Sequence, residues 1–218
     1  MVLLLCGAVG TGKTTVCQKV VNLCRQRGLP CAGILSLPQL DGQGEREGIL
    51  AQDVATGDRW LLARRAAAGD VCIGQYAFEQ EAVQRAVVVL QNAAKSDAAL
   101  LIVDEVGPLE LWLGQGFAPL LPEIARTGKH VLIVVRDGLV PLFLETVEVK
   151  QTVYPFCLTP GNRDELPKRM VETIDPARVP DVTSPYPPDS ADVRTNARDG
   201  KGAVCAGRQA VAGASTGV

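Results

Sequence analysis

The sequence predicts an α/β fold of three layers, with helices on either side of a mostly parallel β-sheet. Predicted strands and helices alternate through most of the first 174 residues, a pattern typical of a wound parallel sheet. A glycine-rich turn joins the first apolar segment directly to an amphipathic one. A later apolar run at residues 99–103 has the length and continuity of a strand that is covered on both faces.

The chain begins with a predicted strand and a predicted helix. Residues 2–6 are apolar up to Gly7 and predict a buried strand. Residues 13–27 predict a helix because apolar side chains recur at intervals of three and four positions. These side chains are Cys17, Val20, Val21 and Cys24. Gly28 follows as a helix stop, and Pro30 prevents the helix from continuing.

The segment after this helix predicts closely spaced strands. Residues 31–37 predict a strand, and the turn at 41–44 leads to further strands at 46–54 and 59–63. Because the connections between them are short, these strands predict an antiparallel insertion beside the otherwise parallel sheet.

The remaining elements alternate again between helix and strand. Residues 79–95 predict a helix with a continuous apolar face, and the strand at 99–103 follows it. The further expected elements are helices at 116–126 and 138–144, strands at 130–135 and 152–158, and a last helix that ends near Ile174.

Regular periodicity stops after about Asp175. Residues 176–188 contain five prolines, and residues 197–218 are dominated by glycine, alanine and serine. Such a composition offers no apolar face to bury. We therefore expect one folded domain over residues 1–174 and a disordered tail over residues 175–218.

Charge and hydropathy limit the class of protein. A formal net charge of −2 provides no basic field for binding nucleic acid or an anionic membrane. No apolar run approaches the roughly 20 residues that a membrane helix needs, and the N-terminus lacks the basic lead-in of a signal peptide. We expect a cytoplasmic protein with no membrane or nucleic-acid partner, and the sequence identifies no protein partner.

The seven cysteines are too scattered for a metal site or a disulfide framework. None forms a C-x-x-C pair, and His130 is the one histidine that could join them. Cys6 and Cys157 fall in predicted strands, whereas Cys17 and Cys24 share one helix face. We expect these thiols to be small buried side chains in a reducing compartment.

The glycine-rich turn has the spacing of a P-loop. Its residues are Gly7-Ala8-Val9-Gly10-Thr11-Gly12-Lys13-Thr14-Thr15. Glycines allow consecutive backbone N–H groups to face phosphate oxygens, and the start of the following helix adds its positive end. Lys13 supplies a positive charge for the outer phosphates, and the Thr14 hydroxyl is a ligand for Mg²⁺. The alternative is a glycine-rich turn that carries a lysine by chance.

The strand at residues 99–103 supplies the second half of the predicted site. Asp104 and Glu105 follow it directly, at the edge where open α/β sheets bind their ligands. Asp104 is expected to hold Mg²⁺ opposite Thr14, and Glu105 to orient or deprotonate an attacking water. This second role favours hydrolysis over phosphate transfer to another substrate. The alternative is a pair of exposed carboxylates at a strand end.

The residues after Val103 resemble a known family. The segment Asp104-Glu105-Val106-Gly107-Pro108-Leu109-Glu110-Leu111 is similar to the extended Walker B segment of the THEP-type nucleoside-triphosphatases. These are small P-loop enzymes that include the cancer-related nucleoside-triphosphatase. Further support comes from Gly44-x-Arg46-x-Gly48, Ile73-Gly74-Gln75-Tyr76 and Leu158-Thr159-Pro160-x-Asn162-Arg163. The resemblance covers about residues 1–174. It implies a RecA-like α/β core and Mg²⁺-dependent hydrolysis of several nucleoside triphosphates to diphosphate and phosphate.

Four other residues are weaker candidates for the site. Arg136 ends a strand and is placed to stabilise charge on the γ-phosphate, although a surface ion pair is the simpler interpretation. Arg46 is either a brace for the site or a charge at a strand edge. Glu110 either orients the turn after the strand or, by default, lies in solvent. Tyr76 is expected to pack rather than to take part in chemistry.

The loop after the last predicted strand is a candidate contact for the base. It contains Thr159, Asn162 and Arg163, and P-loop proteins often bring a loop in this position near the base. Capping of the last helix by Thr159 or Asn162 explains the same residues equally well.

These observations favour an enzyme that hydrolyses ATP, GTP, CTP and UTP with Mg²⁺. The sequence contains no Asn-Lys-x-Asp segment to select guanine, so we expect broad base specificity. One alternative is a kinase for a nucleoside or another small acceptor, which usually needs a lid with several arginines; Arg64-Arg65 is the nearest approach. The other is a nucleotide-gated binding module in which slow hydrolysis resets the conformation.

Overall fold

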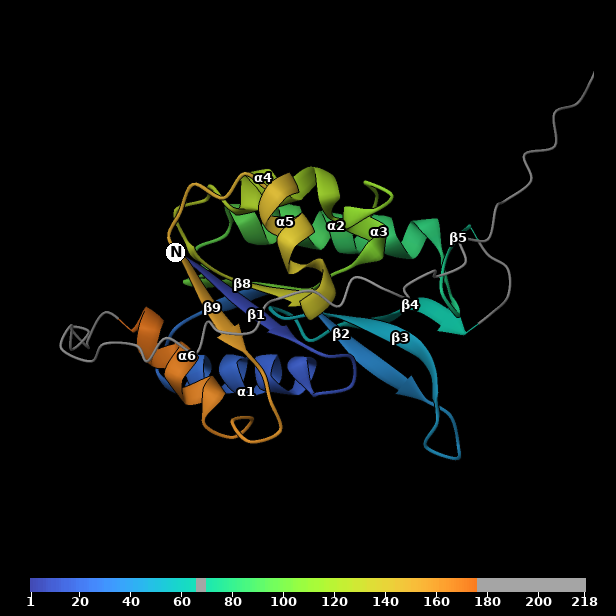
Figure 1. The fold of residues 1–218 in the computed structure, drawn as a ribbon, viewed down its shortest axis with the longest axis horizontal. Helices are drawn as coiled ribbons and strands as arrows, with labels where there is room; N and C mark the ends of the chain where they lie inside the picture. Colours follow the sequence, from blue (N-terminus) through green and yellow to red (C-terminus); the bar gives the residue numbers. More distant parts are fainter. Residues whose placement is uncertain (66–69, 176–218) are drawn as a thin grey trace, which may run out of the picture.

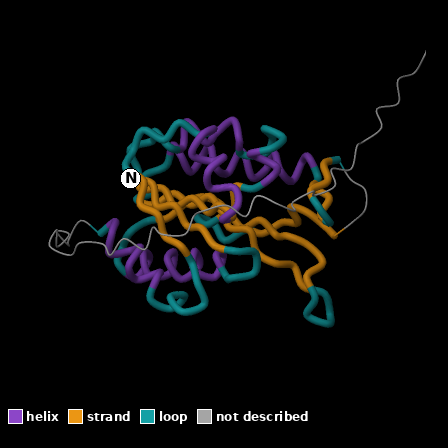
Figure 2. Tube along the Cα trace, viewed as in Figure 1, coloured by secondary structure: helices purple, strands orange, loops and turns teal. Residues whose placement is uncertain are grey.

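The computed structural model describes residues 1–65 and 70–175. Within them, one nine-stranded sheet lies between two layers of helices (Figures 1 and 2). The predicted three-layer α/β architecture is therefore confirmed for this part of the chain. Residues 176–218, which make up almost all of the predicted tail, lie outside the described residues.

One half of the sheet is parallel. In spatial order its strands are β2 (Cys31–Leu40), β7 (Leu100–Val106), β8 (His130–Arg136), β1 (Val2–Gly7) and β9 (Val153–Cys157). β1 lies between β8 and β9 and pairs in parallel with both. The central strands are buried along nearly their whole length because helices cover both faces. Their carboxyl ends meet at one edge of the sheet.

The other half of the sheet is antiparallel. Beyond β2 follow β3 (Arg46–Asp53), β4 (Arg59–Arg65), β6 (Tyr76–Phe78) and β5 (Val71–Ile73). The predicted antiparallel insertion is present, and it extends the sheet beyond β2. The sheet is mixed, and the expectation of a mostly parallel sheet holds only from β2 to β9. The β5–β6 hairpin was not predicted because strands of three residues carry too little periodicity.

The helices divide between the two faces of the sheet. One layer contains α1 (Lys13–Gln26) and α6 (Leu166–Ile174), below the sheet in Figure 1. The other layer contains α2 (Gln80–Lys95), α3 (Pro108–Leu111), α4 (Leu121–Ile124) and α5 (Val140–Thr146). Each layer closes its own apolar core against the sheet. The predicted inner face of the first helix is confirmed, since its four apolar side chains are all buried in α1.

The prediction of one continuous helix over residues 116–126 is wrong. In its place are a 3₁₀ turn, η1 (Ala118–Leu120), and the single turn of α4. Pro119 and Pro122 each lie in the first turn of their own short helix. A proline is tolerated in the first turn because the N–H group that it lacks would have no partner in the helix. In the interior of one continuous helix, each proline would remove a backbone hydrogen bond. A second 3₁₀ turn, η2 (Asp137–Leu139), precedes α5.

None of the helices in the described part of the chain is both long and apolar enough to cross a bilayer.

The parallel strands β2 and β7 leave no room for a side chain at Gly33. Gly33 pairs with Ile102 and has a φ of +121°. A Cβ atom at this position would overlap the carbonyl oxygen of Ile102. Glycine is therefore required both by the backbone conformation and by the space available. This close contact joins β2 to β7, the strand that carries Asp104 and Glu105 farther along.

We expect Gly33→Ala to destabilise the protein severely, by about 3 kcal/mol or more, because a methyl group must displace the backbone of β7. Gly57→Ala is the matched control. Gly57 also has a positive φ, +85°, but an added Cβ would meet nothing within 4 Å, so only about 1 kcal/mol of backbone strain is expected. Urea unfolding measures both. Equal losses in the two variants would contradict the close packing of β2 on β7.

Candidate active site

The P-loop lies between β1 and α1 at the carboxyl edge of the parallel strands. Gly10 and Gly12 have φ values of +82° and +95°, which residues with side chains rarely adopt. The Thr11 hydroxyl donates a hydrogen bond of 2.8 Å to the carbonyl of Ala8 and closes the turn. Gly12, which has no side chain, occupies the cap position of α1. The first N–H groups of the helix are therefore directed into the loop and available to an anion.

Lys13 folds back over this loop. Its ammonium group donates to the carbonyl oxygens of Gly7 at 2.7 Å and of Ala8 at 3.0 Å. The residue is only 6% exposed. Because both acceptors are neutral, the positive charge remains available for an anion held in the loop.

The remaining P-loop residues lie at its margins. Val9 is at the tip and is 72% exposed, and Thr15 is exposed on the first turn of α1. Thr14 faces the sheet, where its hydroxyl donates to the carbonyl of Ser36 at 3.2 Å.

Ser36 connects the P-loop helix to the end of β7. Its backbone N–H donates to Asp104 Oδ2 at 3.1 Å, and its hydroxyl donates to the Asp104 carbonyl at 2.5 Å. The Thr14 hydroxyl also lies close enough to the Asp104 carboxyl group to lower its pKa. The structure thus brings Thr14 and Asp104 together, as the sequence predicted. Ser36 was not predicted, although a lone hydroxyl within the apolar run of β2 was an available signal.

Asp104 is a buried carboxyl group with an altered proton affinity. It is 1% exposed. Burial, assisted by the neighbouring charge of Glu105, raises the pKa of Asp104 to about 7, despite the opposing effects of the Ser36 N–H, the Thr14 hydroxyl and the Lys13 charge. The ionised form is therefore under-compensated by the surrounding protein. An additional positive charge close to the carboxylate would favour ionisation.

Glu105 is paired with Arg136 from the end of the adjacent strand β8. The Nη2 and Nε atoms of Arg136 lie 2.6 Å and 2.8 Å from the same oxygen, Oε1. Both side chains are partly exposed. The ion pair expected for Arg136 is therefore present, and its partner is a predicted site residue. Arg136 restrains Glu105 beside the P-loop and leaves Oε2 outside this pair.

Glu110 is buried, so the default expectation of a solvated carboxylate is wrong. Its Oε2 accepts the Gly107 N–H at 2.9 Å, and its Oε1 accepts the Phe117 N–H at 3.4 Å. Burial raises the pKa of Glu110 to about 7. The side chain ties the turn after β7 to the loop that precedes η1. The contact with Gly107 agrees with the alternative that Glu110 orients the turn, whereas the contact with Phe117, seven residues away, was not predicted.

Two of the weaker candidates contact each other. The guanidinium group of Arg46 lies 5.4 Å from the ring centre of Tyr76, which is the geometry of a cation–π contact. Arg46 also donates to the carbonyl of Gly48 at 3.4 Å. Both residues therefore pack within the antiparallel half of the sheet.

The loop after β9 is organised by its own hydrogen bonds. Asn162 accepts the Thr159 N–H at 2.9 Å and donates to the Cys157 carbonyl at 2.9 Å. These bonds form a turn ahead of α6, whose cap position is Glu165. Capping of α6 by Thr159 or Asn162 is therefore not observed. Arg163, the third candidate, extends over Gly12 of the P-loop.

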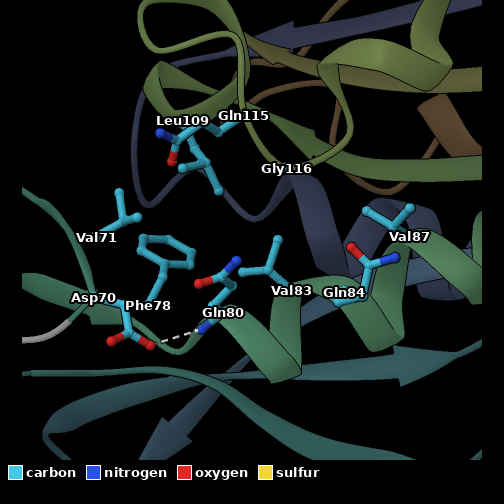
Figure 3. Close-up of a pocket in the computed structure, with 10 residues that line it drawn as sticks. All are labelled: Asp70, Val71, Phe78, Gln80, Val83, Gln84, Val87, Leu109, Gln115 and Gly116. Carbon is cyan, nitrogen blue, oxygen red and sulfur yellow. Dashed lines mark hydrogen bonds between the residues drawn. The ribbon is translucent and has the colours of Figure 1, made fainter.

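A separate cavity of about 510 Å³ lies where β5 and β6 meet α2 and α3 (Figure 3). It is lined from β5, β6, α2, α3 and the residues next to β5 and α3, by Asp70, Val71, Phe78, Gln80, Val83, Gln84, Val87, Leu109, Gln115 and Gly116. The Gln80 N–H donates to Asp70 at 3.0 Å across one end. None of the predicted site residues lines this cavity.

Comparison with known proteins identifies similar sequences. A family model described as NTPase matches residues 2–171. A nucleoside-triphosphatase THEP1 from Methanopyrus kandleri is 35% identical over 171 residues, which cover 78% of this chain and 93% of the relative. A nucleoside-triphosphatase THEP1 from Hyperthermus butylicus is 34% identical over 174 residues, covering 78% of this chain and 89% of the relative.

Two solved structures share the fold. The crystal structure of THEP1 from Aquifex aeolicus has a TM-score of 0.64 at 21% identity and covers 80% of this chain and 99% of its own. The solution structure of a human cancer-related nucleoside triphosphatase has a TM-score of 0.63 at 24% identity, with coverage of 81% and 98%.

The buried Glu110 carboxyl group predicts a pH dependence of stability. Its pKa lies above the ordinary value of 4.5 in the folded protein, so between about pH 4.5 and pH 7 the folded state binds more protons than the unfolded state. The free energy of unfolding therefore falls as the pH rises through this window, by on the order of 3 kcal/mol for this group. Glu110→Gln should flatten the fall.

Urea midpoints of the nucleotide-free protein between pH 5 and pH 8 measure this difference. Asp104 contributes to the fall in both proteins, so the comparison isolates Glu110. Glu123→Gln removes an exposed carboxylate from α4 and should keep the dependence of the parent protein. A slope unchanged by Glu110→Gln would show that this carboxyl group is ionised throughout the range.

Proposed function

This chain belongs to the NTPase family whose model it matches, and we propose that it hydrolyses nucleoside triphosphates to diphosphate and phosphate with Mg²⁺. The observation that carries the proposal is the meeting of two segments far apart in sequence. A cradle of N–H groups with a buried lysine lies at the same sheet edge as Asp104 and Glu105. The groups proposed to bind phosphate and the groups proposed to activate water are thus adjacent.

The P-loop is the binding site for the triphosphate. Backbone N–H groups from Gly7 to Thr15 and the positive end of α1 surround the phosphate oxygens. Lys13 turns its ammonium group from the neutral carbonyls of Gly7 and Ala8 to the charged outer phosphates. Exchange of neutral acceptors for charged ones favours the bound state.

The residues at the end of β7 fit a divalent cation with oxygen ligands. The Thr14 hydroxyl and the Asp104 carboxylate are hard oxygen donors, which suit Mg²⁺. The raised pKa of Asp104 agrees with this assignment, because a buried carboxylate gains from a nearby cation. Bound Mg²⁺ would neutralise charge on the phosphates.

Glu105 orients the attacking water and accepts its proton. The water oxygen bonds to the γ-phosphorus while the bond from that phosphorus to the bridging oxygen of the diphosphate breaks. Arg136 holds Glu105 by one oxygen, and a γ-phosphate offers this guanidinium group a second anion. Sharing of Arg136 between the two anions stabilises the charge that develops on the phosphate.

The substrates we propose are ATP, GTP, CTP and UTP, since the sequence has no Asn-Lys-x-Asp segment that would select guanine. The location we propose is the cytoplasm, where reduced thiols persist. The cysteines in the described residues, six of the seven, are free.

Lys13→Ala should weaken the binding of each nucleotide by about 100-fold or more, because the phosphate charge loses its buried partner. Isothermal titration calorimetry with the Mg²⁺ complex of each nucleotide measures the change. Lys19→Ala is the matched control on the same helix. Lys19 pairs with the exposed Asp164, and loss of such a pair should leave nucleotide binding unchanged. Equal affinities for Lys13→Ala and the parent protein would rule out the P-loop as the phosphate site.

Glu105→Gln should bind nucleotide within about threefold of the parent protein but lower kcat by about 100-fold, since the amide cannot accept the proton of water. Phosphate release from the four nucleotides, without any acceptor, measures turnover. Glu145→Gln, an exposed position on α5, should have normal turnover. Normal turnover in Glu105→Gln would exclude Glu105 as the residue that activates water.

A further inference from the structure

Two cysteines lie side by side directly ahead of the P-loop. Cys6 precedes Gly7 on β1, and Cys157 is its register partner on the neighbouring parallel strand β9 (Figure 1). Their Sγ atoms lie 3.0 Å apart. Neighbouring strands are about 4.8 Å apart, which falls within the range of Cα separations that a disulfide spans. The two sulfurs need to approach by about 1 Å to form a bond.

The two thiols differ in their access to solvent. Cys157 is exposed, so the expectation that it would be buried is wrong. The reason is that β9 ends the sheet order of the described strands and pairs with β1 alone. Cys6 is only 7% exposed. Burial raises the pKa of Cys6, and its neighbours Cys157 and Asp137 add to this effect. An exposed thiol beside a second, resolving thiol is the arrangement that favours reversible oxidation.

The cysteine pair is joined to the P-loop through the backbone. The Leu158 N–H donates to the Cys6 carbonyl at 2.8 Å. The next carbonyl, that of Gly7, accepts the ammonium group of Lys13 at 2.7 Å. A Cβ atom at Gly7 would lie 3.1 Å from both the Cβ and the carbonyl oxygen of Leu158. The start of the P-loop therefore packs directly on the residue that follows Cys157.

We propose that Cys6 and Cys157 are a site of reversible oxidation by hydrogen peroxide, and that the disulfide they form slows nucleotide turnover. The bond itself is independent of the proposed function, whereas its effect on turnover rests on that function. Groups in a catalytic site must be held to within about 0.5 Å. The approach of about 1 Å that the bond requires exceeds this tolerance, and it occurs one residue before Gly7.

The oxidation takes place in two steps. The sulfur of Cys157 attacks one peroxide oxygen, the O–O bond breaks, and the other oxygen leaves with the thiol proton as water. Cys157 is then a sulfenic acid. The sulfur of Cys6 displaces the hydroxyl group, which leaves with the Cys6 proton as a second water. Two thiols are thus oxidised to one disulfide while one peroxide is reduced to two waters. Dithiothreitol reverses the change by thiol–disulfide exchange.

Treatment of the full chain with hydrogen peroxide tests the site. Mass spectrometry of non-reduced peptides should find Cys6 bonded to Cys157, with the loss of two hydrogens. Phosphate release from the Mg²⁺ complex of ATP should fall by about tenfold or more and recover with dithiothreitol. Cys157→Ser should keep the turnover of the reduced parent protein both before and after peroxide. Cys72→Ser, a half-buried position on β5, is the matched control and should lose turnover as the parent does.

Each outcome decides the question. Two unmodified thiols after peroxide would overturn the proposal. So would a Cys157 that stops at a sulfinic acid or bonds another cysteine, such as Cys205, because Cys6 would then not resolve the oxidised sulfur. A Cys6–Cys157 disulfide with unchanged turnover would overturn its effect on the P-loop, and an equal loss of turnover in Cys157→Ser would assign that loss to another group. Failure of the reduced parent protein to release phosphate would instead refute the proposed function, while peptide mapping would still decide whether the disulfide forms.

Discussion

A buried carboxyl group held beside the P-loop is the constraint on which the site depends. Asp104 is held by two contacts from Ser36, one from the backbone N–H to its carboxylate and one from the hydroxyl to its carbonyl. Both require β2 to pair in parallel with β7, which the close approach at Gly33 makes possible. Burial of a carboxylate is costly unless it is fully paired. The pKa of about 7 indicates incomplete compensation, as expected of a site that a cation completes.

Around this carboxyl group, the other charges are held in arrangements that a bound anion would change. The ammonium of Lys13 contacts only neutral carbonyls, and the guanidinium of Arg136 holds one oxygen of Glu105. Both cations lie at the same edge of the sheet, where an anion held in the loop would compete with these partners for them. Glu110 stabilises the turn after β7, because its carboxyl group joins the backbone N–H groups of Gly107 and Phe117. The site is built on strand ends and short turns, which favours precise positioning.

Local chemistry explains why much of the site could be predicted from the sequence. The strand, loop and helix of the P-loop are contiguous, and the positive φ of Gly10 and Gly12 depends on neighbouring residues alone. The buried face of α1 follows from helical spacing. An apolar run that ends in Asp104 and Glu105 is also a local pattern. By contrast, β5, β6 and α3 were not predicted, because each of them holds too few residues to show a hydrophobic period.

The sequence by itself determined the glycine-rich loop before α1, the acidic strand end and the alternation of strands with helices, because each is encoded within a dozen neighbouring residues. The tertiary structure alone decided that Ser36 bonds Asp104, that Arg136 pairs with Glu105 and that Arg163 covers the P-loop. It also decided that the antiparallel strands extend the same sheet. These features join residues that are distant along the chain. They exist because strand pairing brings those residues to one edge, which no local pattern encodes.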